Sequence, residues 1–426
     1  MKNTYIFIAT LALVFISCEK KVQDVVDLKD LTTYLQTQEN DAYERIYTNL
    51  SFWEEKLVKN PNQFPYGAKI AGLETQLFSK TGDIQHLKKA ENLLVLAVEK
   101  SGGKQSGYLR SLARNYISQH QFKKALELLQ KAEMNGDQKQ ETIKMMFDVN
   151  LELGKEKIAY EYLRKIENKR SFDYLIRIAK WKDHKGDLEA TISYMKEALA
   201  GAQKKEYEEL ELWCITNLAD YYGHHGDIEK SYKYYLKTLE KDPNNHYALK
   251  KIAWISFSND KDISEAKKIL KVLDERYKGV DVDLFAYEIA TYEYKEVSEK
   301  LTQYWSKVKD AKYGEMYNKY NFDILIDNKN YKEAYQTALR EVNNRPTAAS
   351  YSMLALATAC FKDPYEGMHI LKTNQVVESY EPEVLLRVAK VYEMNERRDA
   401  LEIIKQELLE ASFELGPVKT NQVLKL

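Results

Sequence analysis

The chain has 426 residues, among them only 16 glycines and 7 prolines, and folds built mainly from strands and turns use both residues more often. The composition therefore favours helices with short connections. Because 64 basic side chains nearly balance 65 acidic ones, the chain lacks the strongly basic character of a nucleic-acid-binding domain, and no nucleic acid partner is expected.

The N-terminus has the pattern of an export signal. Lys2 precedes an apolar run from Tyr5 to Ile16, which is too short to cross a bilayer, because a spanning helix needs about 20 residues. Such a run suits the hydrophobic part of a signal peptide. The small residue Ser17 and then Cys18 follow, after which the sequence becomes polar.

The segment at residues 15–18, with the sequence FISC, resembles a lipobox, the site at which bacterial lipoproteins are processed. The resemblance implies cleavage before Cys18, two acyl chains on its thiol and a third on the new amine, and more than one chain makes a stable anchor. We therefore predict a signal peptide at residues 1–17 and a lipidated tether at residues 18–39. An ordinary signal peptide with an incidental cysteine is the alternative.

A repeat unit is clearest at residues 212–243. Ala219 supplies a small residue where two helices would cross closely. Gly226 and Asp227 separate the two helices, and the Asp227 side chain is suited to cap the second helix. Pro243 then ends the unit, because proline cannot continue a helix.

The same unit recurs along the chain. Pairs of a large apolar residue and alanine lie 34 residues apart, beginning at Leu218 and Ile252, and again at Leu354 and Val388. This order and spacing resembles the tetratricopeptide repeat (TPR), whose period is 34 residues. The resemblance covers about residues 40–410 in eight or nine units, and it is weak at residues 281–308.

We predict an all-α fold, a right-handed superhelical α-solenoid of TPR-like helix hairpins, at residues 40–415, with a C-terminal tail at residues 416–426. Each hairpin of a solenoid buries only one side of itself, and its neighbour covers the rest. Small residues such as Ala113 and Ala179 would let the helices approach. A solenoid of helical hairpins without TPR geometry is the alternative.

No pattern for catalysis or metal binding is present in the sequence. The seven histidines and three cysteines form no pair with zinc-ligand spacing. There is no nucleophile elbow, phosphate loop or dinucleotide fingerprint. We therefore predict no enzyme activity, no metal and no cofactor.

A candidate binding surface follows from the resemblance, because TPR proteins commonly contact ligands through the inward face of the first helix of each repeat. We call the basic and aromatic residues at these positions the predicted stripe. Its members are Arg110, Arg114, Lys144, Arg177, Lys180, Tyr247, Lys250, Trp254, Arg387 and Lys390. They predict a protein or peptide partner, acidic or extended, with arginine forks on carboxylates and Trp254 stacking. The alternative is that they are ordinary solvated or packing residues.

The lipobox variant and the aromatic, lysine-rich composition look like those of bacteria of the Bacteroidota type. Glu19 replaces the Asp that holds some lipoproteins in the inner membrane. We therefore expect a protein-protein interaction scaffold in the cell envelope, anchored by lipid to the outer membrane, with its periplasmic or surface side and its oligomeric state left open. A solute- or glycan-binding lipoprotein of a nutrient-uptake system, and a non-catalytic subunit of an envelope enzyme or secretion complex, are the alternatives.

Overall fold

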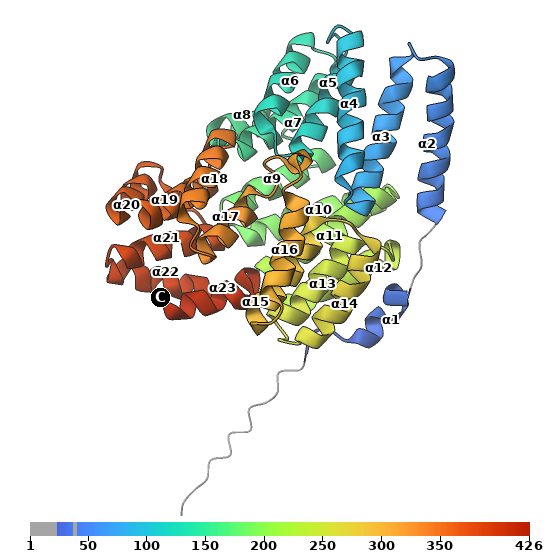
Figure 1. Ribbon diagram of the computed structural model, residues 1–426. Helices are drawn as coiled ribbons and strands as arrows, with labels where there is room; N and C mark the ends of the chain where they lie inside the picture. The colour runs from blue at the N-terminus through green and yellow to red at the C-terminus, as the bar shows by residue number, and fades with distance from the viewer. Residues whose placement is uncertain (1–23, 37–40) are drawn as a thin grey trace, which may run out of the picture.

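The computed structural model describes residues 24–36 and 41–426, so the predicted signal peptide and Cys18 lie outside the described residues. Within them it contains 23 α-helices, two short 3₁₀ helices and no strand. The helices stack side by side in chain order along a curved path (Figure 1). The all-α solenoid of helix hairpins predicted from the sequence is confirmed.

Ten hairpins form the body of the protein, preceded by α1 (Leu28–Gln36) and α2 (Asp41–Lys59). The first five hairpins are α3 (Phe64–Thr81) with α4 (Ile84–Lys100), α5 (Ser106–Ser118) with α6 (Phe122–Asn135), α7 (Lys139–Glu152) with α8 (Glu156–Lys165), α9 (Phe172–His184) with α10 (Leu188–Lys204), and α11 (Glu208–His224) with α12 (Ile228–Lys241). The last five are α13 (His246–Ser258) with α14 (Ile263–Arg276), α15 (Val280–Glu293) with α16 (Val297–Val308), α17 (Asn318–Asp327) with α18 (Tyr331–Asn344), α19 (Ala348–Phe361) with α20 (Pro364–Thr373), and α21 (Pro382–Met394) with α22 (Arg398–Glu410). The 3₁₀ helices are η1 (Ala311–Tyr313) and η2 (Val376–Glu378), and the described chain ends with α23 (Ser412–Lys425).

The repeat period of the sequence is visible in the helix positions. From α5 to α21, the first helices of neighbouring hairpins begin 30 to 38 residues apart. The described residues hold ten hairpins rather than the eight or nine predicted. The difference arises because α15 with α16, where the sequence match is weak, and α17 with α18 are both complete hairpins.

Local signals in the sequence account for the hairpin shape. Asp227 caps α12 as predicted, because its side chain accepts a hydrogen bond from the backbone N–H of Lys230 at 3.2 Å. Asp187 caps α10 in the same way. At the crossings, Ala219 and Ala253 are fully buried, and their small side chains let the helices pack closely.

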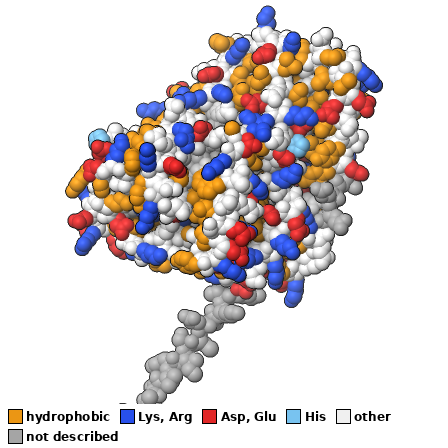
Figure 2. All heavy atoms as spheres, viewed as in Figure 1, with side chains coloured by type: hydrophobic (Ala, Val, Ile, Leu, Met, Phe, Trp, Pro, Cys, Tyr) orange, Lys and Arg blue, Asp and Glu red, His pale blue; other side chains and the backbone are white. Residues whose placement is uncertain are grey.

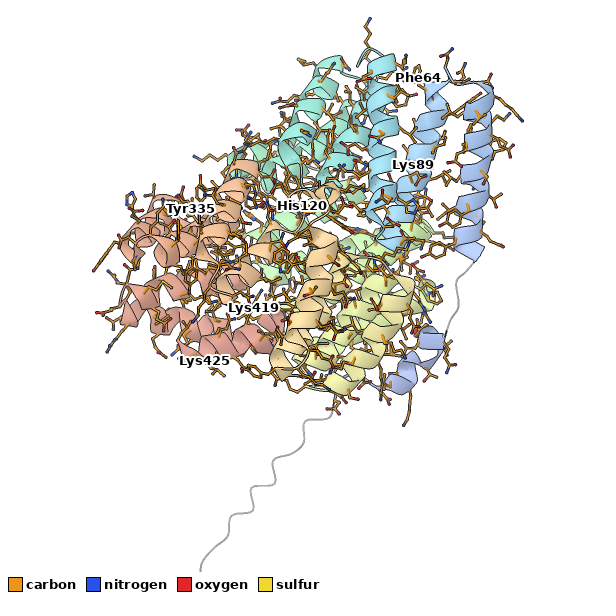
Figure 3. The ribbon with its side chains drawn as sticks, viewed as in Figure 1. Phe64, Lys89, His120, Tyr335, Lys419 and Lys425 are labelled. Carbon is orange, nitrogen blue, oxygen red and sulfur yellow. The ribbon has the colours of Figure 1, made fainter. Side chains whose placement is uncertain are left out.

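The solenoid is wound so tightly that successive turns touch. The backbone N–H of Lys278 donates to the Thr81 carbonyl at 2.7 Å. The Asn344 side chain donates to the carbonyl of His120, 224 residues away. His120 lies at this junction, where α18 comes next to the hairpins of the first turn (Figures 1 and 3). The winding encloses an interior that no single hairpin would form.

The N-terminal described segment packs on the solenoid. The Asp260 carboxylate accepts the backbone N–H groups of Val25 and Val26, each at 3.0 Å. The fully buried Leu31 of α1 joins the apolar core around α12, α13 and α14. The described part of the predicted tether, residues 24–36, is therefore part of the packed body.

The C-terminal helix α23 turns back from α22 and contacts α11, α13 and α15. Residues 416–426, predicted as a tail, form most of this helix. Gly416 interrupts it with φ 76° and ψ 169°, a conformation that favours glycine. No helix among the described residues has the length and apolar character needed to cross a membrane.

We predict that Gly367→Ala destabilises the solenoid. A Cβ at Gly367 of α20 would lie 2.6 Å from the carbonyl oxygen of Ala355 in α19, and such overpacking costs about 1–3 kcal/mol. Chemical denaturation followed by circular dichroism would measure the loss. Gly72→Ala is the matched control, because a Cβ at Gly72 meets nothing within 4 Å and alanine favours helix. Equal midpoints for both variants would contradict the close crossing of α19 and α20.

Candidate binding site: the inner cavity

The interior of the superhelix contains a cavity of about 1450 Å³. The first helices of successive hairpins, α9, α11, α13, α15 and α17, all contribute to its wall. The turn between α7 and α8, the start of α19, the segment leading into α21 and the first half of α23 also line it. The outer surface in Figure 2 shows acidic and basic side chains interspersed, without a large region of one sign. Because this outer face has no concentrated charge, the cavity is the stronger candidate for a binding site.

The predicted stripe is divided by the structure. Lys180, Lys250 and Trp254 line the cavity. Arg387 and Lys390 lie at a smaller pocket beside it. The other five residues, Arg110, Arg114, Lys144, Arg177 and Tyr247, lie outside both pockets.

Basic residues of the stripe pair with acids of a neighbouring hairpin. Lys180 binds Glu152 at 3.0 Å, 28 residues away, and Lys250 binds Asp281, 31 residues away. Two more pairs of this kind join α7 and α9. They are Lys144 with Asp173 at 2.7 Å and Arg177 with Asp148 at 2.9 Å. We call this series the inter-hairpin ion pairs.

The remaining stripe residues also have partners within the chain, with one exception. Arg110 donates to the Asp137 carbonyl and the Gln138 side chain, Tyr247 donates to Asp220, and Lys390 donates to Gln422. Among the described residues, only the exposed Arg114 of the stripe has no side-chain partner. The repeat pattern placed three stripe residues in the cavity wall but did not predict the acids that pair with them. For Lys144, Arg177, Lys180 and Lys250, an acidic residue about one repeat away was the available signal.

Carboxylates outnumber lysines in the cavity wall. The wall contains 12 aspartates and glutamates against 8 lysines, and no arginine. Five of these carboxylates have no ion pair among the described residues: Asp183, Glu288, Glu378, Glu381 and Glu414. Six of the eight lysines are paired, the exceptions being Lys155 and Lys157 at the exposed rim. The sequence analysis did not identify these acidic residues.

Two of the unpaired carboxylates are held in an unfavourable environment. Burial raises the pKa of Asp183; the charges of Glu414 and Glu381 add to this, and His224 opposes it. Burial also raises the pKa of Glu288 to about 7; Lys419 opposes this rise, and the charges of Glu383 and Asp323 add to it. A cation placed beside either carboxylate would be attracted to it.

A compact ion network forms the floor beside Glu288. Arg387, only 3% exposed, donates to Asp323 from Nε at 3.1 Å and Nη2 at 2.9 Å. Glu383 receives Lys319 and Lys419. Burial disfavours the ionised form of Glu383, but the two lysines outweigh burial and lower its pKa. This network fixes the direction of α23 against α17 and α21.

The cavity carries groups suited to binding a cation. Among the described residues, no three His, Cys, Asp or Glu side chains are grouped to hold a metal ion. His184, which lines the cavity, is bound to Glu156 at 2.8 Å. The cavity offers unpaired carboxylates together with the aromatic rings of Trp254, Tyr320 and Tyr351, which are the groups that recognise cations.

Fold and cavity together define the protein as a helical-repeat solenoid with TPR-like hairpins. No family model and no curated protein matches the sequence.

Among solved structures, the chain is similar to the human IFIT1 dimer with PPP-AAAA at 12% identity and TM-score 0.44, covering 77% of each chain. It is similar to yeast Tom70 at 13% identity and TM-score 0.37, covering 93% of each chain. It is also similar to a Rap protein complexed with Competence and Sporulation Factor, at 16% identity and TM-score 0.40, covering 63% of this chain and 88% of the other. These similarities are weak, and they do not indicate which residues bind.

We predict that Glu288→Gln stabilises the protein above neutral pH. With a folded pKa of about 7 against an ordinary value of 4.5, the wild type binds more protons when folded, so its stability falls as the pH rises through this window. Glutamine removes that loss, which is worth about 3 kcal/mol at pH 8. Unfolding free energies of the two proteins should converge below the ordinary pKa.

Glu396→Gln is the control for the loss of one negative charge, because Glu396 is exposed. A stability difference between wild type and Glu288→Gln that is the same at every pH would contradict the raised pKa of Glu288.

Proposed function

We propose that the protein is a lipid-anchored interaction scaffold of the cell envelope that holds a cationic segment of a partner protein in its inner cavity. The observation that carries this proposal is the set of five unpaired carboxylates in the cavity wall. Two of these carboxylates, Asp183 and Glu288, are partly buried, and an ionised group without a partner in such a place is costly for the free protein. The other three, Glu378, Glu381 and Glu414, are exposed and add negative charge at the edge of the site. Such groups become favourable when a lysine or arginine side chain of a partner enters.

The charge distribution favours a cationic partner over the acidic partner expected from the sequence. Lys180 and Lys250 are already bound to Glu152 and Asp281. An acidic ligand would have to displace these carboxylates, whereas a basic ligand meets carboxylates that are free. Trp254, Tyr320 and Tyr351 add ring faces that attract cations.

The anchor at Cys18 supports a particular orientation of this scaffold. Five residues separate Cys18 from Asp24, the first described residue, so the two residues can lie at most roughly 20 Å apart along an extended chain. The Asp260 carboxylate holds Val25 and Val26 against the body. Acylation of Cys18 thus keeps the end of the molecule around α1 and α14 close to the bilayer.

Site-specific photo-cross-linking in the native cell tests the binding proposal. A photoreactive amino acid in place of Tyr351 in the cavity should give an adduct with a polypeptide, whereas one in place of Tyr294, 85% exposed and outside the cavity, should not. The double variant Asp183→Asn and Glu381→Gln should reduce the adduct at least fivefold, because it removes two charges from the cavity.

The matched control is Glu396→Gln with Asp399→Asn, which makes the same charge change at exposed positions outside the cavity. Equal adducts from both positions would contradict the proposal. An oligosaccharide in place of a polypeptide would favour the glycan-binding alternative.

Metabolic labelling with a fatty-acid analogue tests the anchor separately. The wild type should incorporate the label, and Cys18→Ala should lose it together with membrane association, because two or more acyl chains provide the anchor. Cys360→Ala controls for loss of a cysteine elsewhere, since Cys360 lies within α19. Label that persists in Cys18→Ala would contradict the lipobox interpretation.

A further inference from the structure

The last helix does not continue the stack of hairpins but crosses to its inner side. Besides α22, α23 contacts α11, α13, α15 and α21. Figure 1 shows it running from α22 towards α15. Its first half lines the cavity through Phe413, Glu414, Leu415, Val418 and Lys419. Helix α23 therefore occupies part of the surface that the proposed partner would use.

One end of α23 is held by the backbone and ring of Phe413. The Phe413 carbonyl accepts hydrogen bonds from Trp254 Nε1 at 3.1 Å and from Ser258 Oγ at 2.7 Å. Its ring lies against Gly223, where a Cβ would come within 3.1 Å of a ring carbon. Trp254, the aromatic residue predicted to stack on a ligand, thus already binds a segment of its own chain.

The bend in α23 fits this position closely. Gly416 has φ 76°, and a Cβ there would lie 2.5 Å from the Trp254 ring. Any side chain at this position would therefore push α23 away from α13. The glycine permits both the bend and the close approach.

Charged and polar contacts hold the middle of α23. Lys419 pairs with Glu383 and lies 3.5 Å from Asp323; Figure 3 labels it in the middle of the molecule. Gln422 bridges Lys390 at 2.8 Å and Asp327 at 3.2 Å. Helix α23 thus places a lysine beside two carboxylates of the cavity wall, Asp323 and Glu383.

Helix α23 is nevertheless an imperfect occupant. Its Glu414 adds a negative charge beside Asp183 and Glu381, and no lysine of α23 reaches these two carboxylates. Like charges that share a site repel each other. A segment with a basic residue at the place of Glu414 would therefore fit the same groove better.

We propose that α23 is an internal occupant of the partner-binding groove, and that a partner binds by displacing it with a helix of its own. That helix has an aromatic residue at the place of Phe413 and a lysine six positions later, at the place of Lys419. Next to the aromatic residue, at the place of Glu414, it has a basic residue. This inference rests on the proposed function and adds the form of the partner and its regulation. The occupant must leave before the partner segment enters, so binding is coupled to release of α23.

A labelled synthetic peptide of residues 411–426 is the direct probe. The full-length double variant Phe413→Ala and Lys419→Ala removes the Phe413 ring from Gly223 and the Lys419 ion pairs with Glu383 and Asp323. It leaves the side chains that face α23 unchanged. We call it the released variant, because α23 should leave the groove. It should bind the peptide at least tenfold more tightly than the wild type does, because its own α23 no longer competes. The peptide with Glu414→Lys should bind more tightly still, and Glu383→Gln in the released protein should weaken binding at least fivefold.

Hydrogen exchange provides a readout that does not need the released variant. In otherwise unchanged full-length protein, Glu414→Lys should slow amide exchange in α23 at least threefold, because it turns repulsion into attraction at Asp183. Exchange that is unchanged or faster would overturn the proposal, as would a released, folded variant that does not bind the peptide.

The two proposals fail separately. If the photo-cross-linked adducts in the cavity are equally abundant in wild type and released variant, a partner binds there but α23 does not compete with it. If the peptide binds but no adduct forms in cells, α23 occupies the groove but the proposed partner protein does not bind it.

Discussion

The inter-hairpin ion pairs are the interaction on which the inner surface depends. Each hairpin of a solenoid needs its neighbour to cover one of its faces, and here lysines and arginines of one first helix bind acids of the first helix one repeat away. These pairs use up most of the inward basic groups. The cavity wall therefore has more unpaired carboxylates than unpaired lysines. This excess of negative charge favours a cationic partner.

The winding of the solenoid turns this wall into an enclosed site. Contacts between residues about 190 to 225 positions apart, such as Arg345 with Glu152 and Asn344 with His120, join successive turns. Helix α23 then closes part of the interior through Phe413 and Lys419. The outer wall and this inner helix, which is held by polar contacts and by the buried side chains of Leu415 and Val423, are the two-state element of the proposal.

The sequence predicted what depends on local spacing. The 34-residue period located the hairpins, and the turn at Gly226 and Asp227 predicted the cap of α12 correctly. It also placed Trp254 and Lys250 on the inner side. The sequence did not predict that the segment before α1 binds Asp260, or that α23 binds Trp254. These contacts join residues 155 or more positions apart, and such contacts leave no periodic signal in the sequence.

Hydrogen exchange of the full-length protein, with and without a short helical peptide rich in lysine, tests most directly whether the inner cavity is a cation-binding groove that α23 occupies. We expect the peptide to protect the segment around Glu381 and Glu383 and the helices α9 and α11, and to increase exchange in α23. Protection confined to the outer helices α2 and α4, with α23 unaffected, would contradict this.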